Sequence, residues 1–158
     1  MSLIKVKEYL KEYNLDNKII ELESSTATVS EAAQSLNCVE GRIAKTLSFK
    51  LKNEVILVVT AGDLKIDNLK FKKEFGERAH MLDFNLVEKV VGHPIGGVCP
   101  FGINEGIDVY LDKSLKKYES VFPACGSPHS AIELTIKELE DCIKNKRWVD
   151  ICKINKEN

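Results

Sequence analysis

Apolar and polar positions alternate along residues 42–51, and this alternation predicts a β-strand with one apolar face. The odd positions of the strand carry large apolar side chains, namely Ile43, Leu47, Phe49 and Leu51. Lys45 falls on the same apolar face. An ammonium in such a place must find an anion, reach solvent or lose its proton, because burying it unpaired costs several kcal/mol. Lys45 therefore indicates either a cleft for an anionic ligand, or a strand end or bulge that lets the side chain reach water.

Further helices and strands follow from the same kind of pattern. Helices are predicted over residues 4–13, 28–36, 67–75, 83–92 and 135–145, and strands over 19–22, 55–60, 79–82, 107–111, 120–124, 130–135 and 148–151. Thr28 with Glu31 and Thr135 with Glu138 form capping boxes, in which each side chain can satisfy an unpaired amide of the first helical turn. The unbroken apolar run from Val55 predicts a strand that is buried on both faces.

The order of these elements predicts the fold class. Helices and strands are interleaved without internal repeats or low-complexity linkers. This arrangement favours one mixed α/β (α+β) domain over residues 1–158, built on a curved mixed sheet with flanking helices. A chain of 158 residues is long enough to bury about 68 to 70% of the surface that its unfolded form exposes.

Composition narrows the choice of compartment and partner. The chain has 23 Lys and Arg against 24 Asp and Glu, and the net charge of 23 − 24 = −1 provides no overall field that would attract long duplex nucleic acid. A small contact with the end of one nucleic-acid strand is still compatible with this charge. Five cysteines make an odd count without a C-x-x-C pair, which predicts reduced thiols in a cytoplasmic protein. The longest apolar run is far shorter than the roughly 20 residues that span a bilayer, so no membrane segment is expected.

The segment from Gly92 to Gly102 carries four glycines and two prolines in eleven residues. Glycine permits positive φ and close approach, and proline removes freedom, so this composition predicts a fixed and unusual backbone path. Consecutive amides around Val98 and from Phe101 to Gly102 can converge on one space and hold an oxyanion. The alternative is a rigid connection between a helix and a strand.

Other chemistries fit the sequence poorly. Gly97 to Gly102 has the spacing of a phosphate loop, but Ile103 and Asn104 stand where Lys and Ser or Thr would be required. The three histidines show no metal-ligand spacing, so neither a metal nor another cofactor is expected. Cys99 lies in the glycine-rich loop and is a candidate thiol nucleophile, although no base partner can be named for it. A small apolar filler is the alternative role for Cys99.

Three motifs together resemble the YbaK/ProX family. They are the strand Ile43-Ala44-Lys45-Thr46-Leu47, the turn Ala61-Gly62-Asp63 and the loop Gly96-Gly97-Val98-Cys99-Pro100-Phe101-Gly102. The members of this family are free-standing aminoacyl-tRNA deacylases related to the editing insertion domain of bacterial prolyl-tRNA synthetase. The resemblance runs from the Thr28 capping box to the helix at Glu138.

The resemblance implies a function as well as a barrel-like sheet. It implies hydrolysis of the ester that joins a wrong amino acid to a tRNA 3′ end, with Ala, Cys, Ser or Thr on tRNA-Pro as the expected substrates. Lys45 matches the lysine of the family and would engage the terminal nucleotide or the substrate carbonyl. The amides of Gly97 to Gly102 would hold the developing charge, which makes Lys45 and Gly102 the expected catalytic positions. The implied partner is the tRNA acceptor end, and prolyl-tRNA synthetase is a further candidate.

The expected substrate-binding positions are Thr46, Gly97, Val98, Cys99, Pro100, Phe101, Ser127 and His129. Strict alternation along the strand would turn Thr46 away from Lys45, so the two can share a pocket only at a twist or at the strand end. The family more often has serine where this chain has Cys99, and its members differ in the region of Gly126 to His129. His129 would line the pocket or contact the terminal adenosine, or lie solvated in a loop.

Two other functions stay open at this point. One is a non-catalytic module that binds a tRNA 3′ end or an anionic metabolite in the same cleft. The other is a thiol hydrolase that uses Cys99.

Overall fold

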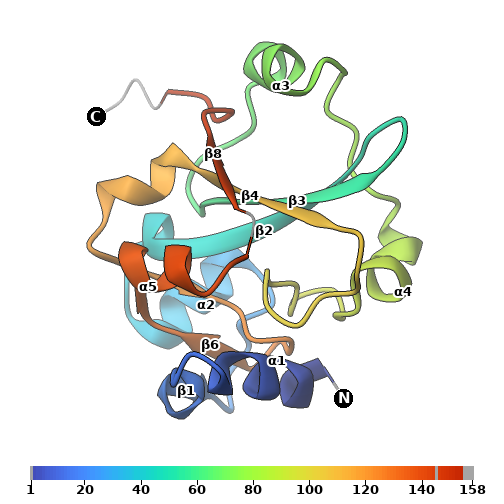
Figure 1. Ribbon diagram of the computed structural model, residues 1–158. Coiled ribbons are helices and arrows are strands. Elements are labelled where there is room, and N and C mark those ends of the chain that lie inside the picture. Colours follow the sequence, from blue (N-terminus) through green and yellow to red (C-terminus); the bar gives the residue numbers. More distant parts are fainter. Residues whose placement is uncertain (1, 145, 155–158) are drawn as a thin grey trace.

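A curved six-stranded sheet, with the shape of a half-barrel, forms the centre of the protein (Figure 1). The computed structural model describes residues 2–144 and 146–154. The strand order is β7-β5-β2-β3-β4-β8. The strands are β2 (Ile43–Lys50), β3 (Val55–Ala61), β4 (Asp108–Asp112), β5 (Ser120–Pro123), β7 (Leu134–Thr135) and β8 (Arg147–Val149). A separate two-stranded sheet pairs β1 (Ile19–Glu21) with β6 (Ser130–Ile132). The predicted mixed α/β fold on a curved sheet is confirmed.

Parallel and antiparallel pairs are mixed within the large sheet. β2 and β3 form an antiparallel hairpin whose register runs from Ala44 opposite Ala61 to Lys50 opposite Val55. β3, β4 and β8 are mutually parallel, so their carboxyl ends meet at one edge of the sheet. β2 also runs parallel to β5.

The helices lie around this sheet. They are α1 (Ser2–Lys11), α2 (Val29–Leu36), α3 (Asn68–Phe75), α4 (Val87–Val91) and α5 (Ile136–Asp141). Short 3-10 turns occur at η1 (Asp16–Lys18), η2 (Glu40–Arg42), η3 (Phe84–Leu86) and η4 (Lys113–Lys117). In Figure 1, α1 lies below the sheet and α3 lies above it.

Both predicted capping residues begin their helices, but only one capping box is complete. The Thr135 hydroxyl accepts the Glu138 N–H at 3.1 Å, and the Glu138 carboxylate accepts the Thr135 N–H at 2.9 Å. At α2 the Thr28 hydroxyl accepts the Glu31 N–H at 3.1 Å. The Glu31 carboxylate, however, accepts the Thr28 hydroxyl at 3.2 Å instead of its backbone N–H. The capping box at α2 is therefore only half formed.

The core lies on both faces of β3. Leu57 and Val59 belong to the larger hydrophobic cluster, and Ile56 and Val58 belong to a second cluster that includes Phe71 of α3. A strand covered on both faces needs apolar residues at every position. The prediction from the unbroken apolar run is confirmed.

Several predicted boundaries are wrong. Residues 79–82 form no strand, because Met81 makes only a single bridge with Phe49. The predicted strand 130–135 is divided between two sheets as β6 and β7, and the predicted helix 83–92 begins as the 3-10 turn η3. The last helix ends at Asp141, and its predicted end at Asn145 lies outside the described residues.

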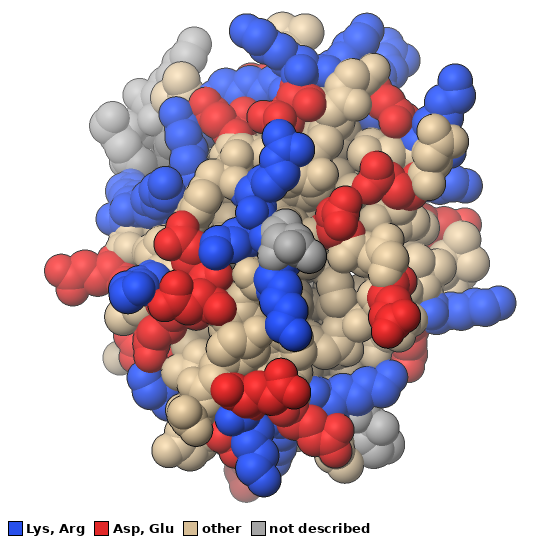
Figure 2. Space-filling view, in the orientation of Figure 1, with Lys and Arg blue, Asp and Glu red and all other residues tan. Residues whose placement is uncertain are grey.

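Charges of both signs are interspersed over the face of the molecule drawn in Figure 2, as the net charge of −1 suggests. Within residues 2–144 and 146–154, no helix is both long enough and apolar enough to cross a membrane.

Candidate active site

The sheet opens beside the first half of β2. β2 pairs with β5 only through Ile43 and Ala44, and further along the same edge the Ser48 carbonyl accepts the Leu82 N–H at 2.9 Å. Between these contacts, at residues 45–47, this edge of β2 has no strand neighbour in the described part of the chain. An opening in the sheet leaves room for a recess at that place.

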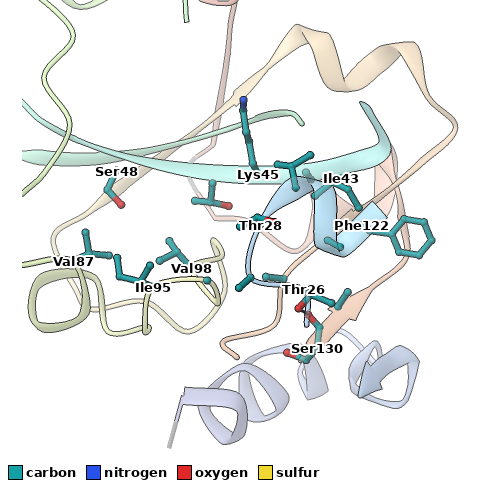
Figure 3. Close-up of a pocket in the computed structure, with 18 of the residues that line it drawn as sticks. Thr26, Thr28, Ile43, Lys45, Ser48, Val87, Ile95, Val98, Phe122 and Ser130 are labelled. Atoms are coloured by element: carbon teal, nitrogen blue, oxygen red, sulfur yellow. Dashed lines mark hydrogen bonds between the residues drawn. The ribbon is translucent and has the colours of Figure 1, made fainter. Parts of the chain in front are cut away.

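A cavity of about 220 Å³ occupies this opening (Figure 3). Its walls come from β2, the start of α2, the glycine-rich loop and the ends of β5 and β6. The apolar part of the wall includes Val29, Ile43, Val87, Ile95, Val98 and Phe122, and the hydroxyl groups belong to Thr26, Thr28, Thr46, Ser48 and Ser130. A small, largely apolar recess with a few hydroxyl groups is suited to a short side chain.

Thr46 contributes a hydroxyl without a partner to this wall. Its Oγ1 is the only buried side-chain nitrogen or oxygen atom in the described residues that makes no hydrogen bond. A buried polar group without a partner costs about 1 to 3 kcal/mol. No protein group in the described residues partners the Thr46 hydroxyl, so this hydroxyl is available to a polar group of a ligand.

The ammonium of Lys45 lies on the other side of the strand. Figure 3 shows the Lys45 side chain pointing away from Ser48 and Val98, and the contribution of Lys45 to the cavity wall is at the strand. Its Nζ donates hydrogen bonds to the carbonyls of Leu64 and Gly62, the second at 3.4 Å. Burial lowers the pKa of Lys45 from its usual value. The cation expected in the cavity is thus bound instead by two carbonyls of the turn after β3.

The glycine-rich loop reaches the cavity through its first half, where it packs closely against other backbone. Gly96 has a φ of 87°, and a Cβ atom there would lie 2.9 Å from the Ala27 Cβ. A Cβ atom at Gly97 would lie 2.5 Å from the Ser127 backbone nitrogen. The Gly97 carbonyl also accepts the Gly126 N–H at 3.0 Å. These contacts require glycine and join the two loops that the sequence places at the site.

Three residues of this loop that line the cavity have amides free of backbone acceptors. They are Ile95, Gly96 and Val98, and none of their N–H groups donates to a backbone carbonyl in the part of the chain that the structure describes. The Gly97 N–H, by contrast, donates to the Pro94 carbonyl at 2.9 Å. Ile95, Gly96 and Val98 are therefore the loop residues whose amides are available to a ligand.

Cys99 is directed into the core. Its side chain is fully buried, and Sγ lies 3.5 Å from the His93 Nε2 and 3.6 Å from the Phe101 carbonyl. Burial raises the pKa of the Cys99 thiol to about 12. A thiol nucleophile needs a lowered pKa and access to the substrate, so this environment argues against the thiol-hydrolase hypothesis.

Of the other expected site residues, none lines the cavity. Gly97, Pro100 and Phe101 are buried in the packing of the loop, and a Cβ atom at Gly102 would lie 3.1 Å from the Lys5 carbonyl of α1. Gly102 and the Lys45 ammonium therefore do not form one centre. The Ser127 hydroxyl donates to Ser130 Oγ at 2.8 Å, and exposed His129 places Nδ1 3.1 Å from the Ser24 carbonyl.

The cavity also contains residues that the sequence reasoning missed. Ala44 and Ser48 face it from β2 on either side of the predicted Thr46, and Thr26, Ser130 and Phe122 complete the wall. In the sequence, the β2 residues could have been found from the small and polar face of the alternating strand, which lies opposite the apolar face that includes Lys45. Ser130 and Phe122 are brought in by tertiary packing and carried no local signal.

Comparison with known proteins identifies the family of the chain. The aminoacyl-tRNA editing domain family matches residues 23–142. The uncharacterized protein YwhH of Bacillus subtilis (strain 168) is 51% identical over 154 residues, which cover 97% of this chain and 98% of YwhH.

Longer relatives and solved structures extend the comparison. The proline–tRNA ligase of Thermosipho melanesiensis is 29% identical over 155 residues, and the match covers 93% of this chain but only 27% of the ligase. A crystal structure described as a candidate trans-editing enzyme for prolyl-tRNA synthetase superposes with a TM-score of 0.86 at 30% identity, covering 97% of this chain and 98% of that one. These findings confirm the predicted kinship with YbaK-type deacylases and, at the level of the family, the predicted hydrolase. The chain belongs to the aminoacyl-tRNA editing domain family.

Proposed function

We propose that this protein hydrolyses the ester between a small amino acid and the 3′ end of a mischarged tRNA, with Ala, Cys, Ser or Thr on tRNA-Pro as the substrate class. The observation that carries the proposal is the cavity beside β2, which is lined both by the unpartnered Thr46 hydroxyl and by the glycine-rich loop. The assignment to tRNA-Pro is supported by the relationship to proline–tRNA ligases.

The size of the cavity supports a small substrate side chain. Pockets for drug-sized ligands have volumes of about 300 to 1,000 Å³, whereas this cavity has about 220 Å³. It can hold an aminoacyl group, and the ribose and adenine then lie at or beyond its mouth. Met81 and Ile95 line the cavity and are also 52% and 43% exposed, which places them at that mouth.

The chemistry needs no covalent nucleophile. Water adds to the ester carbonyl, the carbonyl oxygen becomes an oxyanion, and the bond to the ribose oxygen then breaks while that oxygen takes a proton. The products are the free amino acid and a tRNA with its hydroxyl restored. The N–H groups of Gly96 and Val98 stabilise the oxyanion in this proposal, because fixed donors aimed at developing charge lower the barrier. Thr46 holds the substrate or the attacking water by a hydrogen bond from its hydroxyl, which no protein group engages in the described residues.

Lys45 is a positioning residue in this proposal. Its ammonium is bound to the turn carbonyls of Gly62 and Leu64, so it fixes the β2–β3 end against which the cavity is built. Val29 of the cavity wall packs on the same turn, because a Cβ atom at Gly62 would lie 2.8 Å from the Val29 Cγ1. Gly102 and Cys99 are assigned no part in the reaction.

The proposal is tested with a panel of tRNA-Pro molecules charged with Ala, Cys, Ser, Thr or the cognate Pro. We expect release of at least one of the small amino acids above the uncatalysed rate, with slower release of Pro. Thr46→Val should reduce kcat/KM by about tenfold or more, and Thr46→Ser, which keeps the hydroxyl, should retain most of it. Release from none of the esters defeats the proposal. Saturable binding of the charged tRNA without turnover would instead establish the non-catalytic module.

A further inference from the structure

A second hollow lies at the carboxyl ends of the three parallel strands. Ala61 ends β3, Asp112 ends β4 and Asp150 follows β8, and all three line a hollow of about 370 Å³. In open α/β sheets, ligands bind in the crevice outside the carboxyl ends of parallel strands. Its volume also falls within the range of about 300 to 1,000 Å³ that small-molecule sites occupy.

One turn separates this hollow from the cavity beside β2. Asp63 and Leu64 line the second hollow, and the neighbouring Gly62 contacts Val29 of the first cavity. The Lys45 side chain leaves the strand at the wall of the first cavity and ends on the Leu64 carbonyl. The two hollows are therefore neighbours on opposite sides of the turn at residues 61–64.

Lysines border the second hollow, which we call the lysine groove. Lys70, Lys113, Lys117 and Lys153 all line it. Asp150 fixes two of these ammonium groups, since its carboxylate lies 3.2 Å from the Lys70 Nζ and 3.1 Å from the Lys113 Nζ. Lys117 and Lys153 form no ion pair within the described residues, and both are exposed.

Three carboxylates, those of Asp63, Asp112 and Asp150, also line the groove, and Asp112 is hydrogen-bonded to the protein backbone. Asp112 is fully buried, and its carboxylate accepts the Ser114 N–H at 2.9 Å and the Ile151 N–H at 2.7 Å. The remaining lining includes the apolar Leu64 and Ile154 and the ring of Tyr118. Apolar side chains and an aromatic ring beside exposed ammonium groups fit a ligand that joins a flat base to a phosphate.

We propose that the lysine groove binds a phosphate-bearing nucleotide of the tRNA 3′ strand while the smaller cavity holds the aminoacyl ester. This inference rests on the proposed function. A tRNA whose ester enters the cavity must lay its terminal nucleotides over the surrounding surface, and the groove, across the turn at residues 61–64 from the cavity, is large enough and bordered by lysines. Although the net charge of the protein is −1, the groove supplies a local site for the polyanion.

The test is binding of a fluorescein-labelled RNA hairpin that carries an uncharged acceptor stem with its single-stranded 3′ end, measured by anisotropy between 50 and 200 mM salt. The groove variant is Lys117→Gln with Lys153→Gln. The matched control is Lys11→Gln with Lys50→Gln, which removes the same charge from exposed positions outside both hollows. Each lost phosphate contact lowers the slope of log K against log salt by about 0.7 for single strands, so the groove variant should lose about 1.4. The control should keep the slope of the unmodified protein.

The outcomes separate this inference from the proposed function. If the groove variant keeps the affinity and the salt slope of the unmodified protein, the assignment of the lysine groove to RNA is overturned, even if mischarged tRNA is hydrolysed normally. Weaker hairpin binding in the groove variant supports the groove, even if no ester in the panel is hydrolysed. A parallel titration with free 5′-CMP distinguishes the source of the phosphate. Lysine-dependent binding of 5′-CMP with unaltered hairpin binding assigns the groove to a free nucleotide and overturns its assignment to RNA.

Discussion

Lys45 and Thr46 are adjacent in β2, yet their side chains serve opposite faces of the sheet. The Thr46 hydroxyl lies in the cavity wall without a partner, and the Lys45 ammonium is bound to the Leu64 carbonyl on the other side. The strand keeps strict alternation here, because its pairing with β3 is regular through both residues. The cationic and the neutral polar groups of the strand therefore act in different places.

Thr46→Val should stabilise the free protein. The substitution removes a buried hydroxyl that makes no hydrogen bond and keeps a side chain of similar shape, so the free energy of unfolding should rise by about 1 kcal/mol. Urea denaturation monitored by circular dichroism measures this as a higher midpoint at unchanged slope. A lower midpoint would show that the hydroxyl has a partner in solution. Gain of stability together with loss of activity is the pattern expected of a binding group.

Lys45→Met should weaken the turn after β3. It removes the hydrogen bonds to the Gly62 and Leu64 carbonyls and should lower the free energy of unfolding by about 1 kcal/mol. Steady-state kinetics should show a lower kcat with little change in KM, because the ammonium contacts the turn and not the RNA. Lys65→Met, at an exposed neighbouring lysine, is the control. A raised KM at unaltered stability would place the ammonium on the substrate instead.

Stability should fall below pH 6.5 because of His93. This residue is buried, and burial lowers its pKa below the usual value of 6.5. At pH values just below 6.5, His93 binds a proton in the unfolded chain but stays neutral in the folded protein. The contribution of His93 to the free energy of unfolding is therefore complete above pH 6.5 and declines as the pH falls. The slope can reach about 1.4 kcal/mol per pH unit. Between pH 5 and 7.5, the urea midpoint should depend more steeply on pH in the unmodified protein than in His93→Asn. An equal dependence on pH in the two proteins would contradict the prediction.

Cys99→Ala should leave deacylation intact. The thiol is fully buried, its pKa is raised to about 12, and it does not line the cavity, so its removal should change kcat/KM by less than about twofold. The loss of packed volume should cost about 1 kcal/mol of stability. Iodoacetamide labelling followed by mass spectrometry should modify the partly exposed Cys38 well before Cys99. Loss of all activity in a folded Cys99→Ala protein would restore the thiol mechanism.

Gly97→Ala should separate the two loops at the site. The added Cβ would lie 2.5 Å from the Ser127 nitrogen, and a contact so short forces backbone to move at a cost of about 1 to 3 kcal/mol. Both the urea midpoint and kcat/KM should therefore fall. At Gly106 a Cβ would meet nothing within 4 Å, although the φ of 87° there makes alanine costly for the backbone, so Gly106→Ala tests glycine loss without a clash and should leave kcat/KM unchanged. Equal losses of activity in the two variants would refute the contact argument.

The sequence predicted much of the fold because the signals were local. The alternation of β2, the apolar run of β3 and the capping residues Thr28 and Thr135 each act within a few residues of the element they define. Residues 130–135 were harder, because the change from one sheet to another between Ile132 and Leu134 depends on which strands are nearby. The apolar pattern of residues 130–135 alone does not indicate which sheet each part of the segment joins.

The site was predicted in its neighbourhood and not in its details. The resemblance identified β2 and the glycine-rich loop, and both reach the cavity. It could not show that the loop presents Gly96 and Val98 while turning Cys99 and Phe101 into the core, because the direction of each residue depends on packing against the segment at residues 126–128. The position of the Lys45 ammonium likewise depends on the Leu64 carbonyl, which the chain brings close only on folding.

The small cavity owes its room to short side chains from different segments. Alanines at positions 32, 44, 124 and 131 are among its lining residues. One methylene in such a place alters discrimination by about 1 to 3 kcal/mol. Substrate choice in this protein can consequently diverge by single exchanges in the cavity wall of an otherwise unchanged scaffold, so chains that share this backbone are free to remove different amino acids.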